Sequence, residues 1–453
     1  MERSLGLKLG AIVVLIVMLL VGLLWIGSIV TERQARRDQV VKDIADSSSQ
    51  AQRLVGPIVV VPYEKTIQDW HDDPNTGRHV ITRQISGQLL LLPETLHLEG
   101  EMPTERRARG IYEARLYHAS LRVRATFEIP QHYGVQTDLA AYHFGQPSIA
   151  LGIADIRGIE STSKVSVNQV PVKLSAGTTS PLLGGGVRAP LVSVDPEHAS
   201  SVAFSMDLGI LGTSDFHVIP VGRESQISLS SNWANPSFVG QYLPARHEIR
   251  PKGFNAQWST SFFSTNLEES LRQCTDASVM AANSNACEEF NSRLLGVSFV
   301  DPVDQYLKTD RAIKYALLFI SLTFGGFFLF EVLRKLSVHP IQYALVGVAL
   351  ALFYLLLLSL SEHLGFGSAY VISSGACVAL IGFYVSAILQ SMWRGLGFSA
   401  ALTMLYGTLY ALVSADDYAL LMGSTLLFGL LAAVMVLTRK VDWFALGRRE
   451  EEA

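Results

Sequence analysis

The sequence is short of charge. Asp, Glu, Lys and Arg make up 17% of its 453 residues, below the roughly 25% that is usual in soluble domains. It also lacks an excess of positive charge, because 36 Lys and Arg face 40 Asp and Glu. A nucleic-acid-binding protein normally carries a basic surface, so we expect no nucleic-acid partner. A single soluble globule is not expected either.

The uncharged residues are concentrated in two stretches. Residues 9–30 contain no Asp, Glu, Lys or Arg, and residues 312–437 contain only eight. As a helix, the first stretch is long enough to cross a hydrocarbon core of about 30 Å. We therefore expect a multi-pass protein in the lipid bilayer, with an N-terminal anchor helix over 1–30 and a C-terminal five-helix bundle over 312–437. The five further apolar runs lie at about 315–333, 341–361, 368–391, 397–415 and 418–437.

Basic residues in the short loops predict the orientation. Arg334, Lys335 and Arg394 fall at alternate ends of the expected helices, and Arg439 and Lys440 follow the last of them in a tail over 438–453. Lys and Arg in short loops are retained in the cytoplasm. Both termini are therefore predicted to be cytoplasmic. Residues 31–311, between the first and second membrane helices, are predicted to lie on the outer side.

One group of charges conflicts with this orientation. Basic residues follow the first helix and precede the second, both on the predicted outer side. Long exported domains largely escape the charge rule, so the short loops decide the prediction. The residues concerned are Arg33, Arg36, Arg37, Lys308, Arg311 and Lys314.

Residues 31–311 are predicted to form a large all-β domain, inserted between the membrane helices. Apolar and polar residues alternate from Leu121 to Ile129, a period of two that is typical of a strand with one buried face. The continuous apolar run 58–61 indicates a strand buried on both faces. These runs predict a sandwich or paired sheets. The polar residues 31–53 are expected to continue the first helix as a stalk.

Cysteine is scarce. Cys274 and Cys287 lie in the predicted exported domain with twelve residues between them, and Cys377 lies within an expected membrane helix. An oxidising periplasm permits a disulfide between the first two, which would add roughly 3 kcal/mol of stability. Two unpaired thiols are the alternative. Cys377 is expected to be a small packing residue.

The sequence offers little sign of a metal site. Its densest group of His and Asp, in residues 71–79, is flanked by turn-forming residues and is predicted to be a solvated hairpin loop. His247-Glu248 begins like a zinc-protease motif, but the second His is missing and Pro251 would break the required helix. We expect no metal, no other cofactor and no catalytic residue from these motifs.

Polar residues inside membrane segments are expensive and often functional. Ser359, Ser361, Glu362 and His363 cluster at the outer end of the predicted third helix. A carboxylate and an imidazole there can relay protons or hold a partner loop. A helix cap at the membrane interface is the alternative, and it is favoured. Glu331 is explained by a helical ion pair with the basic residues that follow it.

Several short segments spread through almost the whole chain carry a resemblance to a known family. They are Leu54–Pro57, Arg109–Tyr112, Ser231–Trp233 with Asn235–Phe238, Asp304–Tyr306 with Thr309–Ala312, His339–Tyr343 and Leu360–His363. Together they resemble the CreD inner-membrane protein family. The resemblance implies an inner-membrane protein of Gram-negative bacteria, controlled by the CreBC two-component system and linked to envelope integrity and to the response to β-lactams or colicins. It brings no catalytic residues.

The leading functional hypothesis is a non-enzymatic protein that contributes to cell envelope integrity and stress response. Its periplasmic β-domain would engage an envelope component or protein partner, while the bundle anchors it in the bacterial inner membrane. The alternative is a membrane enzyme or transporter acting on lipid or cell-wall intermediates, with Glu362 and His363 as its functional residues. A sensor subunit is a weaker third hypothesis. The sequence assigns no oligomeric state.

Overall fold

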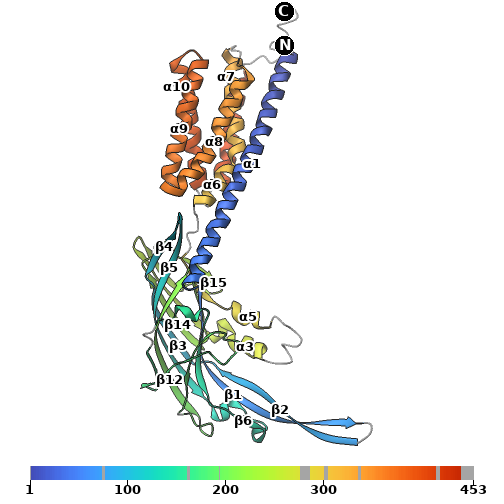
Figure 1. Ribbon diagram of the computed structural model, residues 1–453, viewed down its shortest axis with the longest axis vertical. Coiled ribbons are helices and arrows are strands. Elements are labelled where there is room, and N and C mark those ends of the chain that lie inside the picture. Colours follow the sequence, from blue (N-terminus) through green and yellow to red (C-terminus); the bar gives the residue numbers. More distant parts are fainter. Residues whose placement is uncertain are drawn as a thin grey trace, which may run out of the picture. The chain divides into compact units, whose positions relative to one another are not determined.

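The chain divides into two compact units in the computed structural model (Figure 1). The helical unit comprises Met1–Asp38 and Val303–Ala453, and the β unit comprises Gln39–Pro302. The inserted domain was predicted at 31–311. The boundaries differ because a helix continues past residue 31 and a new helix begins at residue 305. The structure describes residues 2–73, 77–160, 164–192, 194–275, 286–299, 305–334, 338–414 and 419–439.

The helical unit has an N-terminal apolar helix and a series of C-terminal helices, as the sequence predicts. The first helix is continuous for 46 residues and extends beyond the apolar run into the polar stalk. From residue 440 onward, the predicted cytoplasmic tail lies outside the described residues. The helices are α1 (Glu2–Ser47), α6 (Gln305–Lys314), α7 (Ala316–Arg334), α8 (Pro340–Leu364), α9 (Phe366–Ile388), α10 (Met392–Ser414) and α11 (Ala419–Thr438).

Four of the six predicted spans are recognisable among the described residues, and a fifth is added if a bent helix pair counts as one span. In the described part of the chain, α1, α8, α9 and α10 are long and apolar enough, which makes four. The pair α6 and α7 would make a fifth, but it is bent by 46°. The bend separates the charged helix α6 from the apolar helix α7, and the predicted run at about 315–333 coincides with α7 alone. The sixth predicted run coincides with α11, which is not among these four or five.

Aromatic rings fill the centre of the helical unit. The ring of Phe353 on α8 lies 5.5 Å from that of Tyr370 on α9 and 4.6 Å from that of Tyr406 on α10. The Tyr370 hydroxyl donates to the Tyr406 carbonyl oxygen at 2.7 Å. Cys377 is buried beside them, and its sulfur accepts from the Tyr406 hydroxyl at 3.2 Å. Edge-on ring contacts of this kind favour a fixed arrangement of helices.

The β unit contains two sheets. In its described residues, the first sheet has nine strands in the order β10-β11-β7-β1-β13-β18-β15, with β2 and β6 also paired to β1. These strands are β1 (Gln52–Asp73), β2 (Gly77–Leu91), β6 (Tyr142–Phe144), β7 (Ser148–Ile153), β10 (Ser175–Ala176), β11 (Gly186–Pro190), β13 (Asp215–Ile219), β15 (Ser237–Gly240) and β18 (Leu295–Ser298).

The second sheet also has nine strands among the residues described. Their order is β16-β17-β14-β3-β5-β12-β8-β9, with β4 paired to β5. These strands are β3 (Thr95–Glu101), β4 (Thr104–Arg109), β5 (Tyr112–Ile129), β8 (Lys164–Val167), β9 (Val170–Pro171), β12 (Ser200–Thr213), β14 (Glu224–Ser231), β16 (Arg246–Arg250) and β17 (Gly253–Ser261).

Buried side chains from both sheets form one hydrophobic core. On β5 the burial alternates residue by residue, with Leu121 and Val123 buried and Arg122 exposed, which confirms the predicted period of two. The run Ile58–Val61 on β1 is fully buried, as expected for a strand covered on both faces. The β unit is β-rich rather than purely β, because it also contains short helices. They are α2 (Phe262–Thr265), α3 (Leu267–Thr275), α5 (Ala286–Ser292), η1 (Gln131–Gly134), η2 (Leu139–Ala141) and η3 (Ile156–Gly158).

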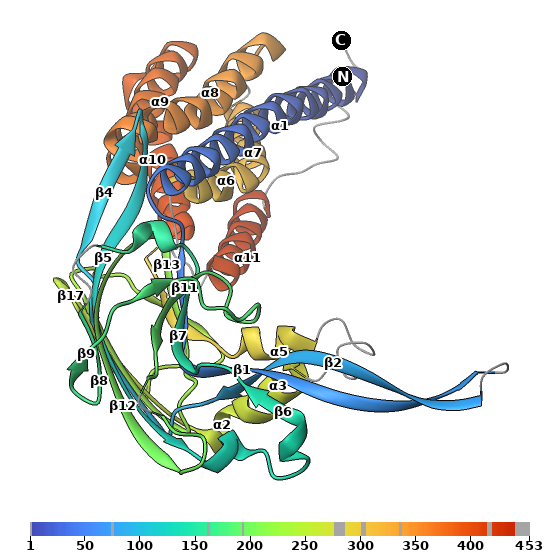
Figure 2. The ribbon, with the colours of Figure 1, turned by 60° about the horizontal axis from the view of Figure 1, so that its bottom comes forward.

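The hairpin of β1 and β2 extends away from the rest of the β unit (Figure 2). Its strands pair antiparallel from Val59 opposite Leu91 to Asp73 opposite Gly77. The residues predicted as a solvated loop, 71–79, lie at its far end. They are largely strand, and residues 74–76 lie outside the described residues. The hairpin leaves β2 paired to β1 and to no other strand in the described chain.

Candidate functional site

The structure separates the polar residues predicted to cluster at the end of α8. Ser361 is buried, and its hydroxyl donates to the Leu358 carbonyl oxygen at 2.9 Å. The Glu362 carboxylate accepts from the Tyr306 hydroxyl at 3.1 Å, and Arg33 Nε lies 3.9 Å from it. These partners come from α6 and α1. The structure therefore gives Glu362 a role in joining the end of α8 to the start of α6 and to the middle of α1.

The other two members of the predicted cluster face away from this contact. Ser359 and His363 are both exposed. A proton relay needs its groups within hydrogen-bond reach of each other, and the partners of Glu362 come instead from other helices. The geometry favours the cap interpretation, while a chemical role for Glu362 and His363 stays a prediction.

A buried carboxylate, that of Glu331, lies at the other end of the bundle. The sequence analysis assigned it to an ion pair with the basic residues that follow it. Glu331 on α7 is 6% exposed. Its carboxylate accepts from the Tyr343 hydroxyl at 2.8 Å and from the Val338 backbone N–H at 3.1 Å. The side chains of Arg334 and Lys335, the expected ion-pair partners, lie outside the described residues. Glu331 thus joins the end of α7 to the start of α8.

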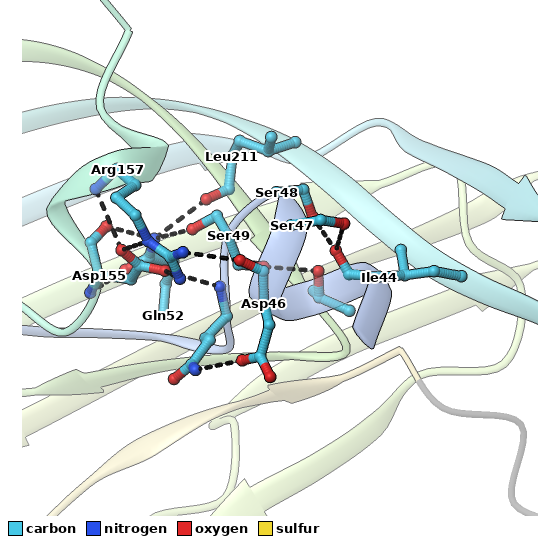
Figure 3. Close-up of polar contacts among 11 residues, drawn as sticks. Ile44, Asp46, Ser47, Ser48, Ser49, Gln52, Asp155, Arg157 and Leu211 are labelled. Atoms are coloured by element: carbon cyan, nitrogen blue, oxygen red, sulfur yellow. Dashed lines mark hydrogen bonds and ion pairs between the residues drawn. The ribbon is translucent and has the colours of Figure 1, made fainter. Parts of the chain in front are cut away.

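In the β unit, a polar network fixes the end of α1 (Figure 3). The fully buried Gln52 is its centre. The Gln52 Nε2 donates to the carbonyl oxygens of Asp155 and Leu211, at 2.9 and 3.0 Å, and to the Ser49 hydroxyl at 2.8 Å. Thr213 donates its hydroxyl to the Ser49 carbonyl oxygen at 2.7 Å. We call these residues, together with Arg157, the α1 joint.

Asp155 carries the charge of the α1 joint. Arg157 donates to its carboxylate through Nε at 2.9 Å and through a terminal nitrogen at 2.7 Å. The Gln50 backbone N–H adds a third bond at 3.0 Å. The hydrogen bonds from Arg157 are the main cause that lowers the pKa of Asp155 to about 2, against the opposing effect of burial. Arg157 also donates to the Asp46 carbonyl oxygen at 2.7 Å, so it caps the last turn of α1.

A neighbouring tyrosine extends the joint into the core. The Tyr117 hydroxyl donates to the Asp215 carbonyl oxygen at 2.6 Å and accepts from the Gln52 backbone N–H at 3.3 Å. Burial raises the pKa of Tyr117 well above its ordinary value. Its phenol therefore stays protonated and acts as a fixed donor at the start of β1.

A pocket of about 940 Å³ lies at the base of the β1–β2 hairpin. Its walls are mainly apolar and include Tyr63, Leu90, Phe144 and Leu182. Polar groups line it as well: Glu64 on β1 stands opposite His143 on β6 in the strand register. Pockets that bind ligands combine apolar walls with a few polar groups in this way, over volumes of about 300–1,000 Å³.

The predicted cysteine pair borders this pocket. Cys274 at the end of α3 and Cys287 at the start of α5 are bonded to each other, with their Cα atoms 4.6 Å apart. The bond ties together two short helices that line one side of the pocket. The sequence suggested this disulfide because the domain was expected in an oxidising compartment. It gave no sign of the pocket beside the two cysteines.

A second, more polar hollow crosses the outer face of the second sheet. Its volume is about 540 Å³. In the strand registers, Gln257, Ser228, Glu99, Arg122 and Asp207 form one row across five strands. Arg122 pairs there with Asp207 at 3.3 Å and with Glu99 at 3.5 Å. These charges satisfy one another. In the described residues, no three His, Cys, Asp or Glu side chains come close enough together to hold a metal ion.

Comparison with known proteins identifies the family. The chain is 36% identical over 432 residues to the inner membrane protein CreD of Escherichia coli K12, covering 95% of this chain and 92% of that protein. Two solved chains of an M1 zinc metallopeptidase from Deinococcus radiodurans each align with 37% of this chain. In one of them, 39% of the metallopeptidase chain is covered at 12% identity, with a TM-score of 0.22. In the other, 38% is covered at 9% identity, with a TM-score of 0.19. Likeness this low carries no argument about function.

The match to a protein family extends over nearly the whole chain, as does the similarity to the Escherichia coli protein. Residues 4–444 match the family described as inner membrane protein CreD. The apolar helices of the helical unit agree with an inner-membrane location. This chain belongs to the CreD family of inner membrane proteins.

Proposed function

We propose that this protein is an anchored receptor of the cell envelope. The helical unit holds it in the inner membrane, the β unit lies on the periplasmic side, and the pocket beside β2 binds an extended segment of a partner protein. Binding of this partner would contribute to envelope integrity. The observation that carries the proposal is the position of the pocket next to the edge of β2 that pairs with no strand among the described residues.

An unpaired strand edge presents backbone donors and acceptors to a partner strand. Ser86, Gly87, Gln88 and Leu90 of β2 line the pocket. A peptide that adds to an edge strand gains main-chain hydrogen bonds, and its alternate side chains enter neighbouring pockets and give specificity. An apolar side chain of the partner would fit the walls formed by Phe144 and its neighbours.

The α1 joint supports the receptor role. A receptor fixed in a membrane needs its binding domain held to its anchor, and α1 is one continuous helix that enters the β unit and ends in the joint. Gln52 and Arg157 bind its last turns to strands and loops that lie about a hundred residues further along the chain. This network fixes the base of β1, the strand that carries one side of the pocket.

Site-specific photo-crosslinking tests the proposal. A photoreactive residue at position 86, in the full-length protein in living cells, should yield a discrete adduct with an envelope protein. The adduct should form with the same yield when the photoreactive residue replaces Gln88, which also lines the pocket. At Val170, exposed on β9 of the other sheet, the same residue should give none.

A blocking variant gives the second half of the test. Ser86→Trp places a large ring at the exposed mouth of the pocket and should reproduce the envelope phenotype of a deletion strain, at normal protein level. Val170→Trp is the matched control and should behave like the wild type. An unchanged phenotype for Ser86→Trp, or equal crosslinking at 86 and 170, would contradict the proposal.

A further inference from the structure

The helical unit contains an apolar groove in its described part. It has a volume of about 810 Å³ and lies between α7, α10 and α11. Leu322, Phe398, Leu405 and Leu421 form much of its lining. At Gly326, also in the lining, a Cβ atom would meet nothing within 4 Å among the described residues. The glycine therefore keeps the groove open on the α7 side.

Three threonines line the groove, and the hydroxyls of two of them are bonded within their own helices. The Thr323 hydroxyl donates to the Phe319 carbonyl oxygen at 2.8 Å, and the Thr408 hydroxyl donates to the Met404 carbonyl oxygen at 2.9 Å. Hydroxyls bonded back to their own helix in this way are satisfied within the membrane. The lining therefore favours a hydrocarbon chain over a polar substrate.

A basic helix lies beside this groove. α6 contacts both α7 and α10, and Lys314 precedes Leu322 by eight residues, roughly 12 Å along a helix. One face of α6 is buried through Tyr306 and Thr309. The basic residues Lys308, Arg311 and Lys314 recur every third position and so share the other side.

This charge pattern fits the surface of a bilayer. A short amphipathic helix with a basic polar face lies in the membrane interface and attracts anionic lipids. The bend of 46° between α6 and α7 marks the point where the chain turns from such a helix into an apolar span. The apolar groove and the basic face thus meet at the same end of α7, with the chemistry of a lipid tail and of a lipid headgroup.

We propose that the helical unit binds one anionic phospholipid at this place. Its acyl chain occupies the groove between α7, α10 and α11, and its phosphate lies against Arg311 and Lys314. The surface ion pair between Lys314 and Asp310, at 2.7 Å, does not oppose this, because exposed pairs contribute little and Lys314 can turn toward a phosphate. A neutral lipid would fill the groove without using the basic face.

Native mass spectrometry of the full-length protein tests this inference. The protein is titrated with phosphatidylglycerol and, separately, with phosphatidylethanolamine of the same acyl chains. One phosphatidylglycerol should bind at least tenfold more tightly than phosphatidylethanolamine. The variant Arg311→Gln with Lys314→Gln should weaken phosphatidylglycerol binding by about 30-fold, since each basic group near a membrane surface contributes about a factor of five.

Matched variants separate the two parts of the site. Arg394→Gln with Arg439→Gln removes the same charge at the start of α10 and just after α11, and it should leave binding unchanged. Gly326→Leu should displace the chain and weaken both lipids. Ala401→Phe, at an exposed position of the groove lining, does the same from α10 if the glycine variant folds poorly.

Three outcomes would overturn the proposal. Equal affinity for the two lipids would remove the role of the basic face. An unchanged affinity in the Arg311 and Lys314 variant, or an equal loss in the control, would do the same. Displacement of phosphatidylglycerol by a polyprenyl phosphate at equal concentration would assign the site to another lipid class.

Discussion

In the helical unit the buried Glu331 accepts from a tyrosine hydroxyl and a backbone amide, whereas in the β unit Asp155 is held by the guanidinium of Arg157. Both carboxylates lie where two segments of chain meet. Both are buried, with Glu331 6% and Asp155 9% exposed. Burial makes an uncompensated charge costly, so each carboxylate is held by more than one hydrogen-bond donor. The two differ in which parts of the chain supply these donors.

This difference shows how each unit fixes its joints. Glu331 and Tyr343 are twelve positions apart, and the short connection between α7 and α8 brings them together. Gln52 reaches Asp155 and Leu211, which lie 103 and 159 positions away. The contact of Glu331 is thus local in the sequence, while the α1 joint depends on the whole β fold. Variants at these residues should therefore differ in how far their effects spread.

The largest effect is expected at the centre of the α1 joint. Gln52→Leu leaves the carbonyl oxygens of Asp155 and Leu211 without their donor, and should lower the free energy of unfolding of the β unit by about 4 kcal/mol. Thermal unfolding followed by protection of the hairpin from protease measures this. Gln50→Ala removes an exposed amide next to the joint and should change stability by less than about 0.5 kcal/mol. Equal losses would show that the joint is unimportant.

The disulfide ranks next. Replacing Cys274 and Cys287 with Ser should destabilise the β unit by about 3 kcal/mol, because the loop between them is no longer closed in the unfolded chain. Intact-mass measurement after alkylation should show both thiols protected in the wild type until a reductant is added. Cys377→Ser is the control, and it should leave the β unit unaffected. Alkylation of both thiols without reductant would refute the bond.

The charge of Asp155 predicts a pH dependence. Its folded pKa of about 2 lies below the ordinary value of 3.8. A lowered folded pKa means that the stabilisation is complete above pH 4 and is lost as pH falls toward 2. The loss amounts to about 2 kcal/mol. Asp155→Asn should flatten this part of the stability curve, whereas Asp207→Asn, at an exposed residue, should leave the slope as it is.

Several features of the fold follow directly from the sequence. The alternation from Leu121 predicts the buried face of β5, because strand side chains point to opposite faces in turn. The uncharged run before residue 30 predicts the membrane part of α1. Hydropathy predicted the start of the apolar run at about residue 315, where α7 begins. It could not predict the 46° bend, because an apolar run looks the same whether the segment before it continues straight or bends away.

The sites were much harder to predict. The pocket takes its walls from β1, β2, β6, a loop near Leu182 and the two helices that carry the disulfide. Sheet pairing and core packing bring these segments together, and neither leaves a local pattern. Gln52 is a polar residue near the start of a strand that becomes apolar from Leu54, but its partners depend on the completed fold.

A smaller effect is expected at the helical counterpart of the joint. Tyr343→Phe removes one hydrogen bond to a buried carboxylate and should lower the stability of the helical unit by about 1.5 kcal/mol. Unfolding in detergent, followed by α-helical circular dichroism, measures this. Tyr410→Phe, at a tyrosine that is 40% exposed, should cost less than about 0.5 kcal/mol. A loss that also spread to the β unit would break the comparison between local and long-range joints.

The smallest effect on stability is expected at the end of α8. There, variants of Glu362 and His363 distinguish a structural cap from a site of chemistry. Glu362→Gln keeps a hydrogen-bond acceptor for Tyr306 but loses the charge facing Arg33, so it should lower stability by less than about 1 kcal/mol and leave the envelope phenotype intact. His363→Ala, at an exposed ring, should change neither. If both variants abolished the phenotype at normal protein level, Glu362 and His363 would act together in chemistry. The contacts of Glu362 would then be secondary, since a cap loses function only by losing structure.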